Sequence, residues 1–361
     1  MSTLRTINVI HPSGSTTNIV NDASGNVTVG NDLTVTGAMV PSSSFKRNRI
    51  INGNMLIDQR NAGAPITAAN LTSGSFMVDR WAYGATIASK FTAQQNAGSV
   101  TPAAGFPNYL GMTVASAYTV SGSDTFSIYQ PIEGYNFADL GFGTASAKTV
   151  TLSFVVYSSL TGTFGGVLKN YAGTRTYPFT YSIPSANTWT TVSVTISGDT
   201  SGTWVGASNA GAAFVQFGLG VGPTSSGTVG AWAATNYNSA TGAVSVVGTA
   251  GATWYITGVQ LEVGTKATPY EMQIYSDQLA QCQRYFQQLN PNVASASSPE
   301  YYYSNGTAGE VRYPLTVAMR TSPIPSTVTQ TNGAYSTYPG AIRFYTTSSG
   351  FIYFATLTAE L

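Results

Sequence analysis

Carboxylates are the side chains best able to do chemistry in this sequence, and they are few. The 361 residues include 14 Asp and Glu, one histidine and one cysteine. A glycoside hydrolase needs two carboxyl groups roughly 5–10 Å apart, one of them with a raised pKa. Glu133 and Asp139 are close in sequence and could meet around a loop. Because this spacing is unspecific, a glycan-cleaving hydrolase is an alternative and not the expected function.

The single histidine and cysteine exclude several other catalytic arrangements. A zinc site needs three or four nitrogen or sulfur ligands, and Ser-His or Cys-His catalysis needs a well-positioned histidine. His11 lies in a thin N-terminal segment, and Cys282 has no partner for an intrachain disulfide. We therefore expect no catalytic residues and no cofactor. A β-sandwich can hold Ca²⁺ through Asp, Asn and backbone oxygens, but no motif specifies such a site.

Aromatic residues beside polar ones suit a different chemistry, the binding of sugars. Sugar rings stack their C–H faces on Tyr and Trp, and their hydroxyls pair with Asn and Arg. Such residues occur in Gly-, Ser- and Thr-rich, loop-like stretches, and the candidates are Tyr171, Arg175, Tyr177, Trp204, Trp232, Tyr237, Asn238, Tyr302, Tyr335 and Tyr338. For each cluster, the alternative is packing against loops or a neighbouring chain. We expect some cluster to bind sugar, and the sequence does not choose among them.

Charge is scarce along the whole chain. Lys and Arg number 15, charged residues make up 8% of the chain, and the net charge is +1. Binding to nucleic-acid phosphates needs clustered Lys and Arg, so we expect no nucleic-acid partner. No apolar run approaches the roughly 18 residues of a membrane helix, and the N-terminus lacks a signal-peptide pattern, so we expect no membrane insertion.

The pattern of apolar residues predicts a mainly β protein. Apolar side chains alternate with period two at residues 150–156, 192–196, 213–221 and 254–263, and Gly-, Ser-, Asn- and Thr-rich turns separate these stretches. This pattern predicts a large β-sandwich over residues 45–272. Within it, residues 258–264 should bring the end of the domain back beside its start.

The N-terminal segment, residues 1–44, has a weaker pattern. Val27, Val29, Leu33 and Val35 alternate with polar residues in strands of only three to five residues. Strands this short cannot be buried by one chain alone. The segment is therefore either a disordered leader or, as we favour, a short shaft of an intertwined homotrimer.

One helix is predicted over about residues 271–289. In the division of the chain into domains, residues 273–291 are assigned to it. Tyr275, Leu279, Cys282, Phe286 and Leu289 form an a/d stripe, and Asn290 and Pro291 end it. The stripe packs either on the chain's own sheet or around a three-fold axis. Residues 292–361 follow as a small C-terminal β domain, with a hairpin turn at residues 346–350.

Four sequence blocks, in order, carry a resemblance to a known family. They are RIINGNMLIDQRN (residues 49–61), FMVDRW (76–81), ITGVQLEVGTKATPYE (256–271) and LAQCQRYF (279–286), with VAMRTSP at 317–323. Over residues 45–289 they resemble tail-fibre and receptor-binding proteins of tailed bacteriophages and prophages. The resemblance implies a jelly-roll domain like a carbohydrate-binding module on a homotrimeric fibre. It also implies a virion location, a tail or baseplate partner for residues 1–44, a C-terminal tip, and host surface polysaccharide as the ligand.

The blocks also contain residues with an expected structural role. Asp58 with Arg60 and Asp79 with Arg80 place opposite charges close together, which predicts a partly buried ion-pair network. The full structural set is Asp58, Arg60, Asp79, Arg80, Trp81, Glu262, Pro269, Leu279, Cys282 and Phe286. Trp81 should lie in the core, and Pro269 should stand just before the helix.

Three alternatives to a fibre that binds glycans without catalysis stay open. The first is a glycan-cleaving tailspike hydrolase, and the second is a purely structural virion fibre or decoration protein. The third is a cellular carbohydrate-binding module, which would have no shaft and no tail partner.

Overall fold

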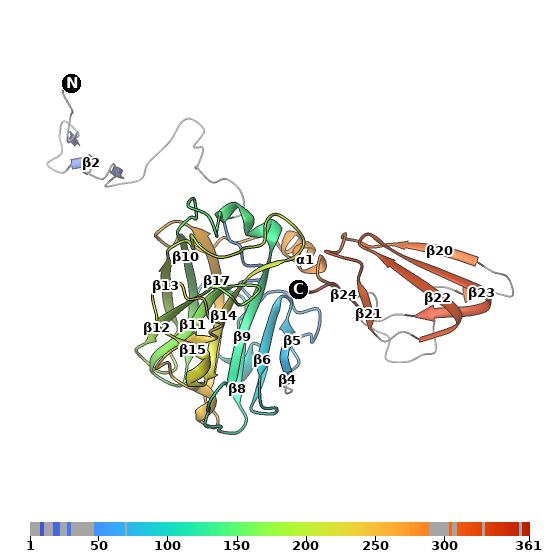
Figure 1. Cartoon of the computed structure of the whole chain (residues 1–361), viewed down its shortest axis with the longest axis horizontal. Helices are drawn as coiled ribbons and strands as arrows, with labels where there is room; N and C mark the ends of the chain where they lie inside the picture. Colours follow the sequence, from blue (N-terminus) through green and yellow to red (C-terminus); the bar gives the residue numbers. More distant parts are fainter. Residues whose placement is uncertain are drawn as a thin grey trace. The chain divides into compact units, whose positions relative to one another are not determined.

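The chain forms two compact units, Met1–Lys46 and Arg47–Leu361. In this computed structural model the described residues are 8–10, 17–21 and 27–29 in the first unit. In the second unit they are 47–68, 71–288, 303–304, 309–326, 329–353 and 356–361 (Figure 1). The fold is mainly β with one α-helix among these residues, which confirms the predicted fold class.

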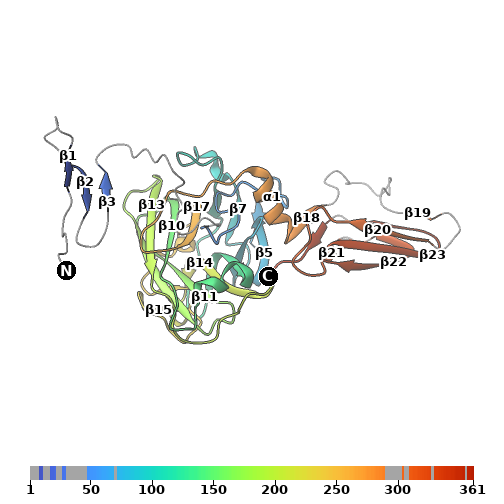
Figure 2. The ribbon, with the colours of Figure 1, turned by 90° about the horizontal axis from the view of Figure 1, so that it is seen from above.

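The first unit contains one small antiparallel sheet. Its strands β1 (Asn8–Ile10), β2 (Thr17–Asn21) and β3 (Val27–Val29) lie side by side in that order (Figure 2). β3 coincides with the first predicted alternating stretch. His11, Leu33 and Val35 lie outside the described residues, and the homotrimeric shaft stays a prediction.

The second unit is built on two six-stranded antiparallel sheets. The first sheet has the order β13 (Thr190–Ile196), β10 (Val150–Ser158), β17 (Thr253–Val263), β8 (Leu110–Val114), β7 (Phe91–Gln95), β4 (Ile66–Thr67). The second has the order β12 (Thr176–Ile183), β11 (Gly162–Asn170), β14 (Gly211–Val221), β9 (Thr125–Glu133), β6 (Trp81–Ala85), β5 (Leu71–Val78).

The core of the sandwich follows from the alternation in the strands. Ala213, Val215, Phe217 and Leu219 of β14 are fully buried in one large hydrophobic cluster with residues of both sheets. The ring of Phe217 lies 5.0 Å from that of Phe154 on the opposite sheet, measured between centroids. Successive side chains of a strand point to opposite faces, so the residues between these four face away from the core. The predicted β-sandwich is confirmed.

The start and end of the sandwich lie together. Arg49 donates its backbone N–H to the carbonyl of Leu261 in β17, at 2.9 Å. The register between β10 and β17 shifts at a bulge that contains Gly258, whose φ of 62° favours glycine. A Cβ on Gly258 would lie 2.5 Å from the ring of Phe106, so no larger residue fits there without movement.

The helix is shorter than predicted. α1 spans Tyr275–Gln283, and Phe286 belongs instead to strand β18 (Phe286–Gln288). β18 pairs with β24 (Thr356–Thr358), so its backbone finds partners in a sheet and not in a continued helix. Pro269 is exposed and lies six residues before α1 rather than next to it. Among the described residues, no helix is long and apolar enough to cross a membrane.

The helix stripe packs against its own chain. Cys282 is buried with Ile51, Ile57 and Tyr285, and Leu279 packs at the edge of this cluster. Tyr275, the first residue of the stripe, is exposed, and Leu289 lies outside the described residues. The stripe thus joins the helix to the first sequence block.

The C-terminal region has its own sheet. β23 (Ala341–Tyr353) pairs with β19 (Tyr303–Ser304), β20 (Gly309–Pro314) and β22 (Thr329–Tyr338), as Figure 2 shows for the three longer strands. The predicted turn at residues 346–350 is wrong, because these residues belong to β23, although the register with β22 shifts between Thr331 and Gly333. Thr346 pairs with Gly309 of β20 on one side and with Gly333 of β22 on the other. This pairing holds the backbone of β23 extended at Thr346.

The last residues of the chain tie this region to the sandwich. β24 lies between β18 and β21 (Ile324–Ser326), and Ala359 donates its N–H to the carbonyl of Tyr285 at 2.7 Å. Arg320 donates to the carbonyls of Ala359 and Glu360 at 2.8 and 2.7 Å, and also to that of Asn209. The C-terminal strand therefore contacts residues from several parts of the second unit.

An ion-pair network lies where the chain end meets the sandwich. The side chain of Arg80 is 1% exposed, pairs with Glu360, and donates to the carbonyl of Pro131 at 2.7 Å. Arg60 pairs with the same carboxylate at 2.6 Å, and its Nε lies 3.6 Å from Oδ1 of Asp79. Glu360, which the sequence analysis did not identify, is thus the shared partner of both arginines.

Three other residues of the structural set take part in hydrogen bonds that link loops to the sandwich or hold a turn. Asp58 accepts hydrogen bonds from the N–H groups of Asn61 and Gly63, at 3.0 and 2.7 Å. Trp81 is fully buried and donates Nε1–H to the carbonyl of Asn52 at 3.0 Å. Glu262 is buried and accepts from the N–H and hydroxyl of Thr268.

We expect Glu360→Gln to lower the free energy of unfolding by about 3–5 kcal/mol, because it leaves Arg80 buried without an anionic partner. Glu310→Gln is the matched control: Glu310 also pairs with two arginines but is 42% exposed, so we expect little change. Urea unfolding of the three proteins measures the difference. Equal losses in the two variants would contradict the role given to Glu360.

Asp79 should make stability depend on pH. Burial raises the pKa of its carboxyl from 3.8 to about 6, against the hydrogen bonds from Gln59 and the charge of Arg60, which lower it. Between these values the folded state holds a proton that the unfolded state has released, so stability falls as pH rises. Relative to Asp79→Asn, the wild type should lose up to about 3 kcal/mol between pH 4 and 6. Urea unfolding of both proteins across this range measures it, and a constant difference would contradict it.

Candidate functional site

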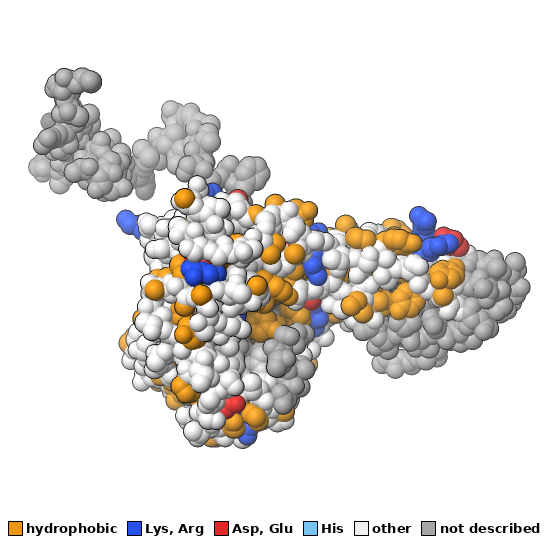
Figure 3. All heavy atoms as spheres, in the orientation of Figure 1, with side chains coloured by type: hydrophobic (Ala, Val, Ile, Leu, Met, Phe, Trp, Pro, Cys, Tyr) orange, Lys and Arg blue, Asp and Glu red, His pale blue; other side chains and the backbone are white. Residues whose placement is uncertain are grey.

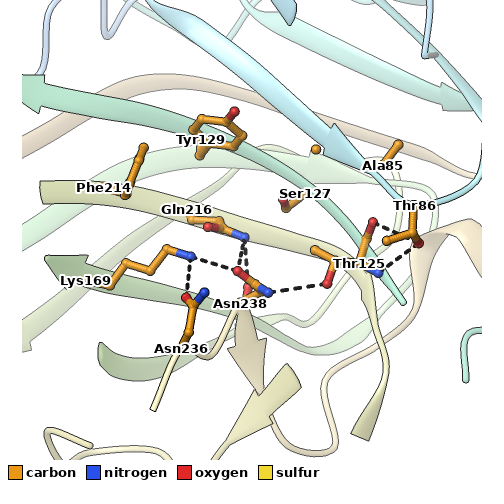
Figure 4. A pocket seen from close by; sticks show the side chains of 11 residues that line it. Ala85, Thr86, Thr125, Ser127, Tyr129, Lys169, Phe214, Gln216, Asn236 and Asn238 are labelled. Carbon is orange, nitrogen blue, oxygen red and sulfur yellow. Dashed lines mark hydrogen bonds between the residues drawn. The ribbon is translucent and has the colours of Figure 1, made fainter. Parts of the chain in front are cut away.

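The candidate site is a pocket on the outer face of the second sheet. Its volume is about 330 Å³, within the range of roughly 300–1,000 Å³ that is typical of small-ligand sites. It is lined by Gly84, Ala85, Thr86, Thr125, Ser127, Tyr129, Lys169, Phe214, Gln216, Asn236 and Asn238 (Figure 4). Most of these residues come from β6, β9, β11 and β14, which are neighbours in the sheet.

The strand alternation that builds the core also builds this pocket. Phe214 and Gln216 of β14 lie between the buried residues Val215 and Phe217 and therefore point outward. On the neighbouring strand β9, Tyr129 is paired with Gln216 in the register. On the other side, Lys169 of β11 is paired with Phe214. Register thus brings residues that are 40 or more positions apart onto one surface.

A polar wall is supplied by the segment between β15 (Ser226–Gly227) and β16 (Ser239–Ala240). Asn238 accepts through Oδ1 from Lys169 Nζ at 2.8 Å and from Gln216 Nε2 at 3.1 Å, and it donates Nδ2–H to the hydroxyl of Thr125 at 3.3 Å. Asn236 accepts from Lys169 at 3.1 Å. Figure 4 shows these side chains meeting along one side of the pocket. The network fixes the orientation of both asparagines.

Aromatic rings form the opposite side. Phe214 stacks on Tyr171 with a centroid distance of 4.7 Å and an interplanar angle of 16°. Tyr129 meets Phe214 edge-on at 5.5 Å and 85°. Gly211 permits this arrangement, because a Cβ there would lie 2.3 Å from the Tyr171 ring. Apolar rings facing amide groups and one ammonium can hold a flat, hydroxyl-bearing ligand such as a sugar ring.

Two of the residues proposed from the sequence lie at this pocket. Asn238 lines it, and Tyr171 stacks on the lining residue Phe214. Tyr237 lies beside Asn238 in sequence, and its ring packs over Gly227. The binding role of these residues stays a prediction.

Four other proposed residues lie together at a second place. Arg175 forms a bidentate ion pair with Asp199, with both N–O distances at 2.7 Å. Trp204 donates Nε1–H to the same carboxylate at 3.1 Å. Trp204 also stacks on Phe137 at 5.4 Å and 11°. Trp232 meets the Trp204 ring edge-on at 5.6 Å, and Tyr177 is buried beside Trp232. These contacts give all four a packing role.

The remaining candidates lie in the C-terminal region. Tyr335 and Tyr338 belong to β22, where Tyr335 packs on the small cluster around Phe344 and Tyr338 is exposed. Tyr302 lies outside the described residues. Neither Tyr335 nor Tyr338 lines the pocket, and whether any of the three binds sugar stays a prediction.

Sequence reasoning did not select Lys169, Phe214, Gln216 or Tyr129, because it looked for binding residues in loops. A usable signal was present in the alternation. A Phe and a Gln that face away from the core on one strand must meet solvent or a ligand, and their neighbours follow from the register. The register itself could not be read from the sequence.

The two carboxylates considered for hydrolysis are held in separate ion pairs. Glu133 accepts from Arg284 at 2.5 and 3.0 Å and from the hydroxyl of Tyr285. Burial acts to raise the pKa of Glu133, but the hydrogen bonds from Arg284 and Tyr285 outweigh it and lower the pKa. Asp139 is exposed and pairs with Arg49 at 2.8 Å. Glu133 therefore lacks the raised pKa that a general acid needs.

Metal ligands are not gathered in the parts of the chain that the structure describes. No group of three or more His, Cys, Asp or Glu side chains is close enough there to hold a metal ion.

Comparison with known proteins gives a likeness of fold alone. The sequence matches no protein-family model and no curated protein. Among solved structures, TmCBM61 in complex with β-1,4-galactotriose is 9% identical, covering 61% of this chain and 100% of that one, with a TM-score of 0.31. A family 11 carbohydrate-binding module from Clostridium thermocellum, in complex with a β-1,3-1,4-mixed-linked tetrasaccharide, is 11% identical, covering 56% and 98%, with a TM-score of 0.27. Because both TM-scores are below 0.5, the likeness does not bear on the ligand of this chain.

Proposed function

We propose that this chain binds glycans without catalysis, through the pocket on the outer face of the second sheet. The observation that carries the proposal is the arrangement of Phe214 and Tyr129 opposite the amides of Gln216 and Asn238. Rings of this kind stack on the C–H faces of sugars, and amides pair with sugar hydroxyls. Because the amides already hold each other in place, a ligand finds them ordered before it binds.

The molecular surface offers mainly uncharged groups for contact with a glycan. In Figure 3, polar uncharged side chains and backbone cover much of the described face, with patches of hydrophobic side chains and a few scattered charged groups. Of the eight ion pairs among the described residues, most have at least one well-buried partner. Much of the scarce charge is thus used inside the fold, and hydroxyls and amides are left for contact with other molecules.

The biological setting we propose is the tail of a bacteriophage. The four sequence blocks support a receptor-binding protein of a tail fibre, assembled as a homotrimer and located in the virion. Residues 1–44 would attach to a tail or baseplate protein, and the C-terminal region would lie at the tip. The glycan would be a polysaccharide of the host surface. Weak sugar contacts suit this task, because three subunits and several fibres multiply them.

We expect Phe214→Ala to weaken glycan binding about tenfold or more, because it removes the ring on which Tyr171 and Tyr129 are arranged. Tenfold corresponds to about 1.4 kcal/mol. Binding of the purified proteins to an array of bacterial surface polysaccharides measures it, followed by titration with the polysaccharide that binds. Tyr135→Ala, which removes a ring that is 62% exposed and does not line the pocket, is the control and should bind normally.

Two results would contradict the glycan-binding proposal. One is a wild-type protein that binds no polysaccharide on the array. The other is equal binding by the wild type and Phe214→Ala, with both proteins folded by circular dichroism. Soluble wild-type protein should also compete with phage adsorption, which a purely structural fibre protein would not do.

Exposed apolar residues beside α1 form a surface through which the proposed homotrimer would assemble. Met272, Ile274 and Tyr275, just before and at the start of α1, are all more than half exposed although they are apolar. We expect Ile274→Asp, at a side chain that is 67% exposed, to shift the protein from trimer towards monomer in sedimentation velocity. Ile324→Asp is the control, because Ile324 is equally exposed elsewhere, and it should leave the trimer intact. A wild-type protein that sediments as a monomer would contradict the proposed assembly.

A further inference from the structure

Lys169 is the unusual residue of the pocket. Only 7% of the residue is exposed, although lysine is seldom buried to this extent without a charged partner. Its ammonium group donates to two side-chain amide oxygens, Oδ1 of Asn236 and Oδ1 of Asn238. It also lies 5.7 Å from the centroid of the Phe214 ring. Figure 4 shows the side chain extending along the pocket towards the two asparagines.

No carboxylate balances this charge among the residues that the structure describes. Lys169 takes part in none of the ion pairs there, whereas the buried Arg80 pairs with Glu360 and Arg175 pairs with Asp199. Removing an ammonium from water without an opposite charge is costly. The cost is visible in the pKa of Lys169, which burial lowers from 10.5 to about 8.

An anionic group on the ligand would supply the opposite charge that the buried ammonium of Lys169 lacks. We propose that the pocket takes an acidic sugar, whose carboxylate or sulfate group contacts the ammonium of Lys169 while the sugar ring lies against Phe214. The two asparagines hold the ammonium in place through oxygens that are only partly charged, so a full anion forms a stronger partner. This inference rests on the proposed function and narrows it from glycans in general to glycans with anionic units.

The other titratable groups near the pocket are two tyrosines and Asp124. Tyr129 lines the pocket, and Tyr171 lies behind Phe214. Asp124 accepts hydrogen bonds from Tyr118 and from Thr86 at the pocket rim, and the hydrogen bond from the Ser121 N–H lowers its pKa. Asp124 therefore keeps its charge between pH 6 and pH 9 and does not cause a change of binding over this range.

The test compares acidic polysaccharides with neutral forms of the same chains. The probes are bacterial polysaccharides containing uronic acids, each beside its carboxyl-reduced form, and O-sulfated polysaccharides beside their desulfated forms. We expect the wild type to bind at least one acidic form ten times or more tightly than its neutral form. The arm in which the preference appears identifies carboxylate or sulfate as the anion.

Lys169→Met should abolish the preference while the protein stays folded, because it removes a charge that has no ionic partner among the residues that the structure describes. Lys148→Met, at an exposed lysine outside the pocket, changes the net charge equally and should keep the preference. Binding of the acidic form by the wild type should weaken about tenfold from pH 6 to pH 9, as the free ammonium with a pKa of about 8 loses its proton. Lys169→Met should lack this pH dependence.

The possible failures are distinguishable. Equal binding of acidic and neutral forms by the wild type would overturn the anion site but keep the glycan-binding function. A preference that survives in Lys169→Met would overturn the role of this residue. No binding to any form would overturn the glycan-binding function itself.

Discussion

The two-residue repeat of the β-strand is the constraint on which this molecule depends. Each strand of the second sheet must supply apolar side chains to the core at every second position, and it presents the residues between them to the outside. In β14, the same segment buries Val215 and Phe217 and exposes Phe214 and Gln216 to the pocket. A shift of one residue in the register would exchange the two sets and destroy core and pocket together.

The few charged residues follow a second rule, which is that a buried charge needs an opposite one. Arg80 is satisfied by Glu360, Arg175 by Asp199, and Glu133 by Arg284. Each of these pairs joins segments far apart in sequence, and Arg80 and Glu360 are 280 residues apart. Such pairs contribute more to the choice of one arrangement than to net stability, because desolvation offsets most of their attraction. Two buried charged residues depart from this rule among the described residues. Glu262 accepts hydrogen bonds from the neutral groups of Gln260 and Thr268, and Lys169 is the buried cation without an ion pair, at the candidate site.

Contacts within the protein also decide which of the sugar-binding candidates are available to a ligand. Arg175 is held by its bidentate ion pair with Asp199, and Trp204 is stacked on Phe137. Both side chains therefore already have partners within the protein. Tyr171 is stacked too, but on a ring that borders open space. Aromatic residues in loop-like sequence are therefore a poor guide to a binding surface, because a loop can fold back on the sandwich and bury them.

The sequence by itself determined the mainly β fold, because alternation at residues 150–156 and 213–221 leaves a strand as the only element that buries one apolar face. It also marked Asp79, Arg80 and Trp81 as unusual in a chain with so little charge. It predicted too long a helix and put a turn inside β23, because the partners β24, β20 and β22 that keep these segments extended come from elsewhere in the chain. Only the tertiary structure decided that Lys169, Phe214 and Asn238 meet in one pocket and that Glu360 joins Arg80. These contacts depend on strand register and loop position, which local sequence does not fix because they arise from pairing between distant segments.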